Sequence, residues 1–472
     1  MHITIIGAGP GGYETAVEAA SKDIDVTIVS DGPVGGTCLN EGCIPTKTYH
    51  RNAELLESLR NPEAYGICAD GISFDFAKAR QRKDAVVEQL RGGVEFLLKN
   101  KHIRLVYGKA SLKDSHTVSV VPSGGGDAEE IASDYIIIAT GSVSATLPIP
   151  GAEHEGVVNS TQLLSAEAVP QKLCIIGAGV IGLEFASIFK SFGSEVTVLE
   201  YCKEILPRFD TDLAKRLKQA LSKRGITIET SAQVKEIVPS GDGDLTVKYM
   251  KKDKELETSA DKVLMAVGRK PAVEKLNLAD SGIEFSAKGI ATDRDMRTNI
   301  PNIFAIGDIR GGMMLAHTAV FEGKRALAAI LADIREGGVG KGTADDGIDF
   351  GITPAAVFTY PEAATVGLTE EDCQTRGIKC KCRKSFFRAN GKAVAMGETE
   401  GYCKIIEAAP QETENGFREG QILGCHLFGA HAPDLVQEIA ALMGRKASMD
   451  DLRSTIHAHP TLAEVILSAA NS

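Results

Sequence analysis

The most regular pattern of apolar and polar positions occurs twice in the chain. Residues 3–31 read ITIIGAGPGGYETAVEAASKDIDVTIVSD, and residues 173–201 read LCIIGAGVIGLEFASIFKSFGSEVTVLEY. Each copy is an apolar run, a glycine-rich turn, a stretch with helical spacing and a second apolar run. Such a copy predicts a strand–helix–strand unit that opens a parallel sheet. Two of them predict two dinucleotide-binding domains in one chain.

The remaining pattern predicts smaller elements. Residues 51–100 are rich in charge and helix formers and predict long helices, whereas residues 103–138 alternate and contain a hairpin turn at 123–126. A buried strand is expected at 136–138, ending near Gly141. Prolines at 148 and 150 and the glycine-rich stretch 337–347 predict linkers. From about residue 350 the chain mixes strands (354–359) with a helix near 433–445. We therefore expect an α/β fold: two Rossmann-like dinucleotide-binding domains and a C-terminal α+β domain.

Composition narrows the function classes. The 472 residues carry a formal net charge of −11, so no general electrostatic attraction to nucleic acid or to an anionic membrane is available. No apolar stretch is long enough to span a bilayer, and the first residues lack a secretory or Arg-rich targeting pattern. Ten cysteines lie scattered along the chain. This usage is typical of a reducing compartment, and we expect a cytoplasmic protein.

The glycines of the two turns have the spacing that phosphate binding requires. Both turns read G-x-G-x-x-G between a strand and a helix, so that a pyrophosphate can lie on the helix N-terminus; the six positions are Gly7, Gly9, Gly12, Gly177, Gly179 and Gly182. Glu200 ends the second strand of the second copy, where an acid binds a ribose hydroxyl and repels a 2′-phosphate. The second site is therefore expected to take NAD rather than NADP. In the first copy, Ser30 holds this position and Asp31 follows, and both stay open as the ribose partner.

Two further groups carry redox and acid–base chemistry. Cys38 and Cys43 can form a bridge if one lies at a helix start and the other one turn on, where the helix N-terminus favours a thiolate. No second cysteine or histidine pair with ligand spacing lies nearby, and we expect no resident metal. Near the end of the chain, His459 precedes Glu464 by five residues. Such a pair can act as an oriented base. The close pair Cys380 and Cys382 lies in a basic run and predicts a solvated strand.

Together these residues identify a resemblance. GGTCLNEGCIPTK (35–47), the two glycine turns, Thr140-Gly141, the run from Ile303 to Asp308 and HAHPTLAE (457–464) resemble the pyridine nucleotide–disulfide oxidoreductase family over essentially the whole chain. The resemblance implies an FAD-binding domain at 1–145, an NAD-binding domain at 146–270, a central domain at 271–345 that completes the FAD site, and an interface domain at 346–472. It also implies a homodimer.

The resemblance assigns roles to single residues. FAD would contact Gly7, Gly9, Gly12, Ser30, Asp31, Thr37, Lys47, Thr140, Gly141, Asp308 and Ala316, and NAD would contact Gly177, Gly179, Val180, Gly182, Glu200 and Gly268. Cys43 would be the thiol next to the flavin and Cys38 the thiol that exchanges with substrate. Lys47 would pair with Glu184. His459, oriented by Glu464, would be the base and would come from the partner subunit.

The implied activity is oxidation of protein-bound dihydrolipoamide to lipoamide by NAD, through FAD and the Cys38–Cys43 disulfide. The implied partners are a lipoyl-bearing acyltransferase or a glycine-cleavage carrier protein. Two positions depart from the pattern: Ser30 replaces the usual acid at the FAD ribose, and Thr318 stands where a lysine is usual.

Other family members are disfavoured by particular features. Mercuric reductases and large thioredoxin reductases add a late cysteine pair, but no cysteine follows Cys425 here. Soluble transhydrogenases lack the first redox cysteine, and glutathione reductases prefer NADP. A flavoprotein that serves only as a scaffold would have a broken redox pair or no base, whereas Cys38, Cys43 and His459 are all present.

Overall fold

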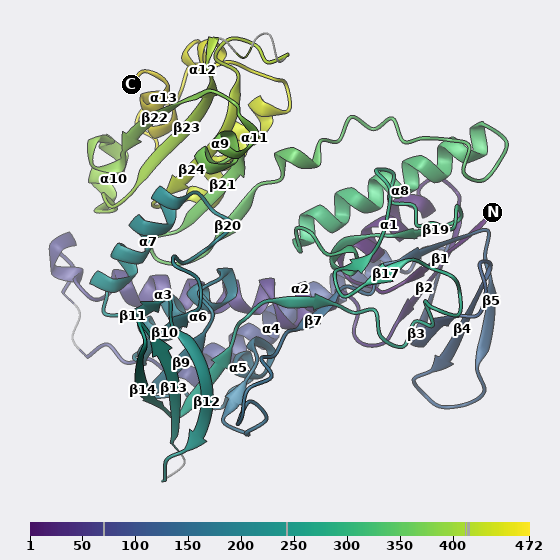
Figure 1. Ribbon diagram of the computed structural model, residues 1–472, viewed down its shortest axis with the longest axis horizontal. Coiled ribbons are helices and arrows are strands. Elements are labelled where there is room, and N and C mark those ends of the chain that lie inside the picture. Colours follow the sequence, from purple (N-terminus) through teal and green to yellow (C-terminus); the bar gives the residue numbers. More distant parts are fainter. Residues whose placement is uncertain (69–70, 242–243, 411, 413–415) are drawn as a thin grey trace. The chain divides into compact units, whose positions relative to one another are not determined.

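The computed structural model describes residues 1–68, 71–241, 244–410, 412 and 416–472 (Figure 1). The chain forms two compact units, each built from three segments. The first unit contains Met1–Thr48, Lys78–Ala145 and Arg269–Ile348, and the second contains Tyr49–Ala77, Thr146–Gly268 and Asp349–Ser472.

A seven-stranded sheet forms the centre of the first unit. Its spatial order is β19 (Ile303–Ala305), β6 (Tyr135–Ile138), β1 (His2–Ile6), β2 (Asp25–Ser30), β3 (Ile103–Leu112), β4 (Thr117–Pro122) and β5 (Glu129–Ala132). The strands from β19 to β3 pair in parallel, and β4 and β5 continue as an antiparallel extension. Ile3, Ile5 and Ile137 are completely buried, as expected of strands covered on both faces.

Helices of the first unit pack through small residues. Helix α1 (Pro10–Ala20) contacts α8 (Ala316–Arg335) closely. A Cβ on Gly323 would lie 1.9 Å from the Thr15 hydroxyl, and one on Gly11 would lie 3.0 Å from the Ala319 carbonyl oxygen, so this crossing requires glycine. The unit also contains α2 (Gly36–Glu41), the start of α3 (Cys43–Ser58), most of α4 (Phe76–Leu97), η2 (Gly307–Arg310) and the short pairs β7 (Ser142–Ser144) with β16 (Arg269–Pro271) and β17 (Phe285–Ser286) with β18 (Gly289–Ile290).

The second unit contains a five-stranded parallel sheet. Its order is β11 (Thr227–Thr230), β10 (Glu195–Glu200), β9 (Lys172–Ile176), β15 (Lys262–Met265) and β8 (Val157–Val158). Helix α6 (Val180–Phe192) connects β9 to β10, and α7 (Thr211–Lys223) precedes β11; a three-stranded antiparallel sheet follows, formed by β12 (Gln233–Pro239), β13 (Leu245–Lys251) and β14 (Lys254–Ala260). Together with the first unit, this sheet confirms the two strand–helix–strand repeats predicted from sequence.

The C-terminal part of the second unit is α+β, as predicted. Its antiparallel sheet has the order β20 (Ala355–Val357), β21 (Ala363–Gly367), β24 (Ile422–Phe428), β23 (Tyr402–Ala408) and β22 (Cys380–Phe386). Its helices among the described residues include α9 (Glu370–Arg376), α10 (Gly391–Met396), α11 (Ala432–Met443), α12 (Met449–Arg453) and α13 (Glu464–Ala470). The second unit also contains the end of α3, α5 (Ser160–Leu164), η1 (Pro62–Tyr65), η3 (Phe350–Ile352) and η4 (Phe387–Ala389).

One sequence prediction for this sheet was wrong. Cys380 and Cys382 are half-buried and pack against a small apolar cluster that includes the buried Cys373, so this face of β22 is not solvated. The basic residues gave a wrong prediction for the cysteines because side chains alternate along a strand. Lys381 and Arg383 therefore point to the opposite face of β22 from Cys380 and Cys382.

Candidate active site

The first glycine turn connects β1 to α1 in the first unit. Gly7 has φ +113°, and a Cβ there would lie 2.3 Å from the Ala139 carbonyl oxygen. A Cβ on Gly12 would lie 1.9 Å from the Gly7 carbonyl oxygen, so both positions require glycine. By contrast, the nearest atom to a Cβ on Gly9 would be the Gly36 Cα, 3.9 Å away, so the helix N-terminus is open there. The turn therefore fits a dinucleotide pyrophosphate.

The second turn repeats this geometry between β9 and α6 in the second unit. Gly177 has φ +106°, and a Cβ there would lie 2.4 Å from the Ala266 carbonyl oxygen. A Cβ on Gly182 would lie 2.0 Å from the Gly177 carbonyl oxygen, whereas one on Gly179 would meet nothing within 4 Å. This cradle also fits a pyrophosphate, with Gly179 as the position of closest approach.

The two turns differ at the end of their second strand. Glu200 is buried, and its carboxylate accepts hydrogen bonds from the backbone N–H of Ala178 (2.6 Å) and of Cys202 (2.7 Å). It thus places a fixed negative charge beside the glycine turn. In the first unit, Ser30 is buried and donates its hydroxyl hydrogen to the Gly32 carbonyl oxygen at 2.7 Å, while Asp31 is exposed. Ser30 can therefore accept a hydrogen bond from a ribose, and Asp31 is the carboxylate of this strand end.

Cys38 and Cys43 form a disulfide. They lie on two successive helices. Cys38 lies in α2, the chain breaks helical geometry at Gly42 (φ −138°, ψ −102°), and Cys43 is the first residue of α3. A glycine accepts both helical and non-helical dihedral angles, so the sequence did not reveal this break. Cys43 is therefore the cysteine that lies at the N-terminal end of a long helix.

An asparagine holds the cysteine segment in place. The Asn40 side-chain NH₂ donates to the carbonyl oxygens of Val34 and Gly36, both at 3.0 Å. Its oxygen accepts from the Arg91 Nε at 2.9 Å. Sequence analysis missed this contact because Arg91 comes from α4, and no motif links the two positions.

Asp308 lies in η2 within a network that the sequence also did not reveal. Ser142 donates to the Asp308 carboxylate at 2.5 Å and accepts from the Arg269 Nε at 2.7 Å. Glu322, from α8, accepts from the Gly307 backbone N–H at 2.5 Å and pairs with Arg310. Three distant segments therefore fix this turn, so only the fold could bring them together.

The remaining predicted FAD contacts lie in the same unit. Gly141 has φ +73°, its carbonyl oxygen accepts from the Ala272 N–H at 3.0 Å, and Thr140 donates to the Ala272 oxygen at 3.4 Å. Ala316 is the first residue of α8, and Thr37 is exposed on α2.

In the first turn of α8, the buried Thr318 hydroxyl has no hydrogen-bond partner among the described residues. An orphaned polar atom at this point fits a unit that binds a polar cofactor.

The predicted base has the expected partner. His459 Nδ1 lies 2.9 Å from a Glu464 carboxylate oxygen, and the other Glu464 oxygen accepts from the Thr461 N–H at 2.9 Å. That backbone hydrogen bond and the His459 ring together hold the pKa of Glu464 below its usual value. The His459 side chain is 78% exposed, so its Nε2 can exchange protons. His457 differs, because both of its ring nitrogens contact oxygens, at Thr455 and Glu438.

The remaining predicted positions lie on α3, on α6 and after β15. Val180 is the first residue of α6, and Gly268 has φ +111° after β15. Glu184 is buried on α6 and accepts from the Phe358 N–H at 3.0 Å, and Lys47 lies on α3. Lys47 and Glu184 belong to different units, and their pairing stays a prediction.

With these features in place, comparison with known proteins defines the class. Residues 1–323 match the model of the pyridine nucleotide-disulphide oxidoreductase family, and residues 353–470 match its dimerisation domain. The chain belongs to this family, whose cofactors are FAD and a pyridine nucleotide. The matched dimerisation domain supports the expected homodimer.

Particular relatives are similar over their full length. The chain is 38% identical to the dihydrolipoyl dehydrogenase of Bacillus subtilis over 469 residues, covering 99% of this chain and 95% of that protein. It is also 38% identical to the dihydrolipoyl dehydrogenase of Geobacillus stearothermophilus, covering 99% and 94%. Among solved structures, it resembles the Cu(II) complex of the HOCl-induced flavoprotein disulfide reductase RclA from Escherichia coli, with a TM-score of 0.85, 29% identity and coverage of 100% and 98%.

Within the described residues, no helix combines the length and the apolar character that crossing a membrane requires.

Proposed function

We propose that this chain oxidises protein-bound dihydrolipoamide to lipoamide with NAD as acceptor. The observation that carries the proposal is the Cys38–Cys43 disulfide, which follows the strand–helix–strand repeat of the first glycine turn in the same unit. The His459–Glu464 pair and the full-length similarity to dihydrolipoyl dehydrogenases support the same activity. The proposal includes a cytoplasmic homodimer and a lipoyl-bearing acyltransferase or glycine-cleavage carrier as partner.

The proposed chemistry is thiol–disulfide exchange. One substrate thiolate attacks the Cys38 sulfur, the Cys38–Cys43 bond breaks, and Cys43 leaves as a thiolate. The second substrate thiolate then attacks the substrate sulfur of the mixed disulfide, which forms lipoamide and releases Cys38. His459 takes the proton of the attacking thiol, and Glu464 stabilises the imidazolium that results; the proton of the second thiol passes to the Cys38 thiolate as it is released. Held at the first glycine turn, FAD would supply the redox carrier that takes the two electrons of the reduced cysteine pair, so that the Cys38–Cys43 disulfide re-forms and NAD becomes NADH with release of one proton.

The surroundings of each residue support its role. Cys43 begins α3, and the N-terminal end of a helix favours an anion, so Cys43 is the better leaving thiolate. The buried Glu200 carboxylate disfavours the 2′-phosphate of NADP at the second turn. His459, 78% exposed, and Ile456, 97% exposed, form a surface that fits contact with a second copy of the chain.

A steady-state comparison tests the proposal. The purified FAD holoenzyme is assayed for NADH formation with free dihydrolipoamide and, separately, with reduced glutathione, each with NAD and with NADP. We expect the highest kcat/KM for dihydrolipoamide with NAD, by at least about tenfold over each alternative. A preference for another thiol, or for NADP, would contradict the proposed substrate or acceptor.

The similarity to RclA favours a second candidate, a reductase of another small disulfide. Electrons would then pass in the opposite direction, from NADH through the same cysteine pair to the disulfide substrate. Oxidation of NADH by the holoenzyme with lipoamide and with other small disulfides distinguishes the two. The second candidate requires a disulfide whose kcat/KM exceeds that of lipoamide.

A further inference from the structure

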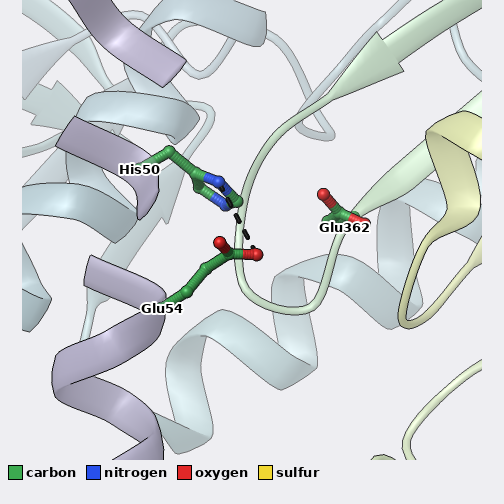
Figure 2. A group of neighbouring side chains, drawn as sticks. All are labelled: His50, Glu54 and Glu362. Carbon is green, nitrogen blue, oxygen red and sulfur yellow. Dashed lines mark ion pairs between the residues drawn. The ribbon is translucent and has the colours of Figure 1, made fainter. Parts of the chain in front are cut away.

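A cluster of potential metal ligands lies in the second unit, apart from all the residues assigned above. His50 and Glu54 are one turn apart on α3, and Glu362 lies directly before β21. One ligand atom of each residue lies within 4.8 Å of those of the other two. Figure 2 shows the three side chains around a common space between α3 and the loop that leads into β21. Sequence reasoning could not find this group, because Glu362 is distant in the chain.

The hydrogen bond of His50 orients its ring for ligation. Its Nε2 lies 3.3 Å from the Thr359 carbonyl oxygen, and a carbonyl oxygen can only accept, so Nε2 carries the hydrogen. In the neutral ring, Nδ1 therefore presents its lone pair, and it lies 3.9 Å from a Glu54 carboxylate oxygen. Metal-binding histidines are commonly held in this way by a backbone carbonyl. The ring is also fixed sterically, since the side chain is 7% exposed and meets the Phe358 ring edge-on.

The two carboxylates offer oxygen ligands within a negative environment. One Glu54 oxygen pairs with Arg51 at 3.2 Å, while the other faces His50. The half-buried Glu362 carboxylate lies near the negative charges of Glu54, Asp434 and Glu398 and accepts a hydrogen bond from the His431 backbone N–H. Arg51 is 59% exposed and can move into solvent. Bringing carboxylates together in a partly buried site is unfavourable unless a cation or a proton is shared between them.

We propose that His50, Glu54 and Glu362 bind a divalent transition-metal ion. An imidazole with two carboxylates suits Mn²⁺, Fe²⁺ or Zn²⁺, whereas Ca²⁺ and Mg²⁺ prefer oxygen ligands alone. Metal–ligand bonds of about 2.1 Å would require the three ligand atoms to approach one another to roughly 3.0–3.5 Å, which rotation of the flexible glutamates permits. Three protein ligands leave further positions for water. The site uses none of the proposed catalytic residues, so it is independent of the proposed function.

Manganese titration tests this site directly. Mn²⁺ prefers oxygen and nitrogen ligands, and the holoenzyme is kept oxidised so that Cys38 and Cys43 offer no thiolate. The electron paramagnetic resonance signal of free Mn²⁺ decreases as the ion binds. We expect one competable site per chain, from which Zn²⁺ displaces Mn²⁺. Glu362→Gln should weaken binding at least about tenfold.

Two matched variants separate ligation from general electrostatics. Asp434→Asn removes an equal charge near Glu362 but no ligand, and it should change the affinity less than about threefold. Arg51→Ala removes the competing partner of Glu54 from an exposed position and should tighten binding. Flavin absorbance and the melting temperature confirm that each variant is folded. The proposal is overturned if the wild type binds neither ion at such a site, or if Glu362→Gln and Asp434→Asn weaken binding equally, since either result would leave a shared proton as the role of the cluster.

Discussion

The two redox sulfurs differ in their position relative to a helix end. Cys43 begins the 16-residue α3, whereas Cys38 lies inside the six-residue α2. The partial positive charge at a helix N-terminus is larger for the longer, well-formed helix, so a thiolate is more stable at Cys43. Under the proposed function, Cys38 is then the sulfur that exchanges with substrate. The sequence predicted the pair itself, since the spacing and the surrounding motif are specific, but not the break at Gly42 that separates the two helices.

Replacing Cys38 tests this division of roles. Cys38→Ser should lower kcat for dihydrolipoamide oxidation by roughly three orders of magnitude or more, because no sulfur remains for exchange. The long-wavelength absorbance of a thiolate next to the flavin should persist, because Cys43 is retained. Cys68→Ser, at an exposed free cysteine, is the matched control and should leave turnover unchanged. Full activity of Cys38→Ser would remove Cys38 from the reaction.

Glu200 is expected to determine the choice of nucleotide. Glu200→Ala removes a buried negative charge and the acceptor of the Ala178 and Cys202 N–H groups. The ratio of kcat/KM for NAD to that for NADP should fall about tenfold or more, and KM for NAD should rise. Glu195→Ala, at the exposed opposite end of β10, provides the control. An unchanged ratio would mean that other residues select the nucleotide.

At the scale of elements, the sequence predicted the strands and turns whose signals are local. The apolar runs of β1 and β9 and their glycines specify a buried strand and a tight turn within a few residues. The Asp308 turn is different, because its supports Ser142, Arg269 and Glu322 come from separate segments. Packing alone brings these residues together, so no pattern in the sequence could reveal the network.

A buried ion pair anchors the end of α8. Asp333 lies 2.9 Å from Arg297 and also accepts from the Gly342 N–H at 2.8 Å. Asp333→Asn would leave the Arg297 guanidinium buried without its counter-charge, and it should destabilise the first unit by about 3–5 kcal/mol. Thermal unfolding of the holoenzyme measures the loss, with the exposed Asp345→Asn as control. Equal melting temperatures for the two variants would exclude this role.

The same pair predicts a pH dependence. Burial opposes ionisation of Asp333, but the N–H groups of Gly340 and Gly342 and the Arg297 guanidinium outweigh it and hold the pKa of Asp333 below 3.8. Its contribution to stability is therefore fully present above pH 3.8 and is lost as the pH falls through the lower, folded-state pKa. Over this acid range, the stability of wild type should approach that of Asp333→Asn.

At the scale of the whole molecule, the two dinucleotide turns lie in different units, and the proposed base lies in the C-terminal part of the second. The internal repeat and the order of motifs were sufficient to predict this fold class. They could not show which chain supplies each group, because a sequence contains no information on the copy from which a side chain comes. The exposed His459 and Ile456 are the structural reason to expect a partner.

Mixed dimers test whether His459 acts in the partner's site. Cys38→Ser and His459→Gln homodimers should each be nearly inactive. A co-expressed heterodimer of the two variants should regain about half of the wild-type activity, because one of its two sites combines an intact cysteine pair with an intact histidine. If both groups act within one chain, the heterodimer stays inactive.

The most direct test of the account is anaerobic stopped-flow mixing of the oxidised holoenzyme with dihydrolipoamide and NAD. If electrons pass through the Cys38–Cys43 disulfide, the long-wavelength thiolate–flavin absorbance must rise at least as fast as turnover, and NADH must form after it. Formation of NADH without that absorbance, or absorbance without NADH, would contradict the proposed path from dithiol to disulfide to nicotinamide.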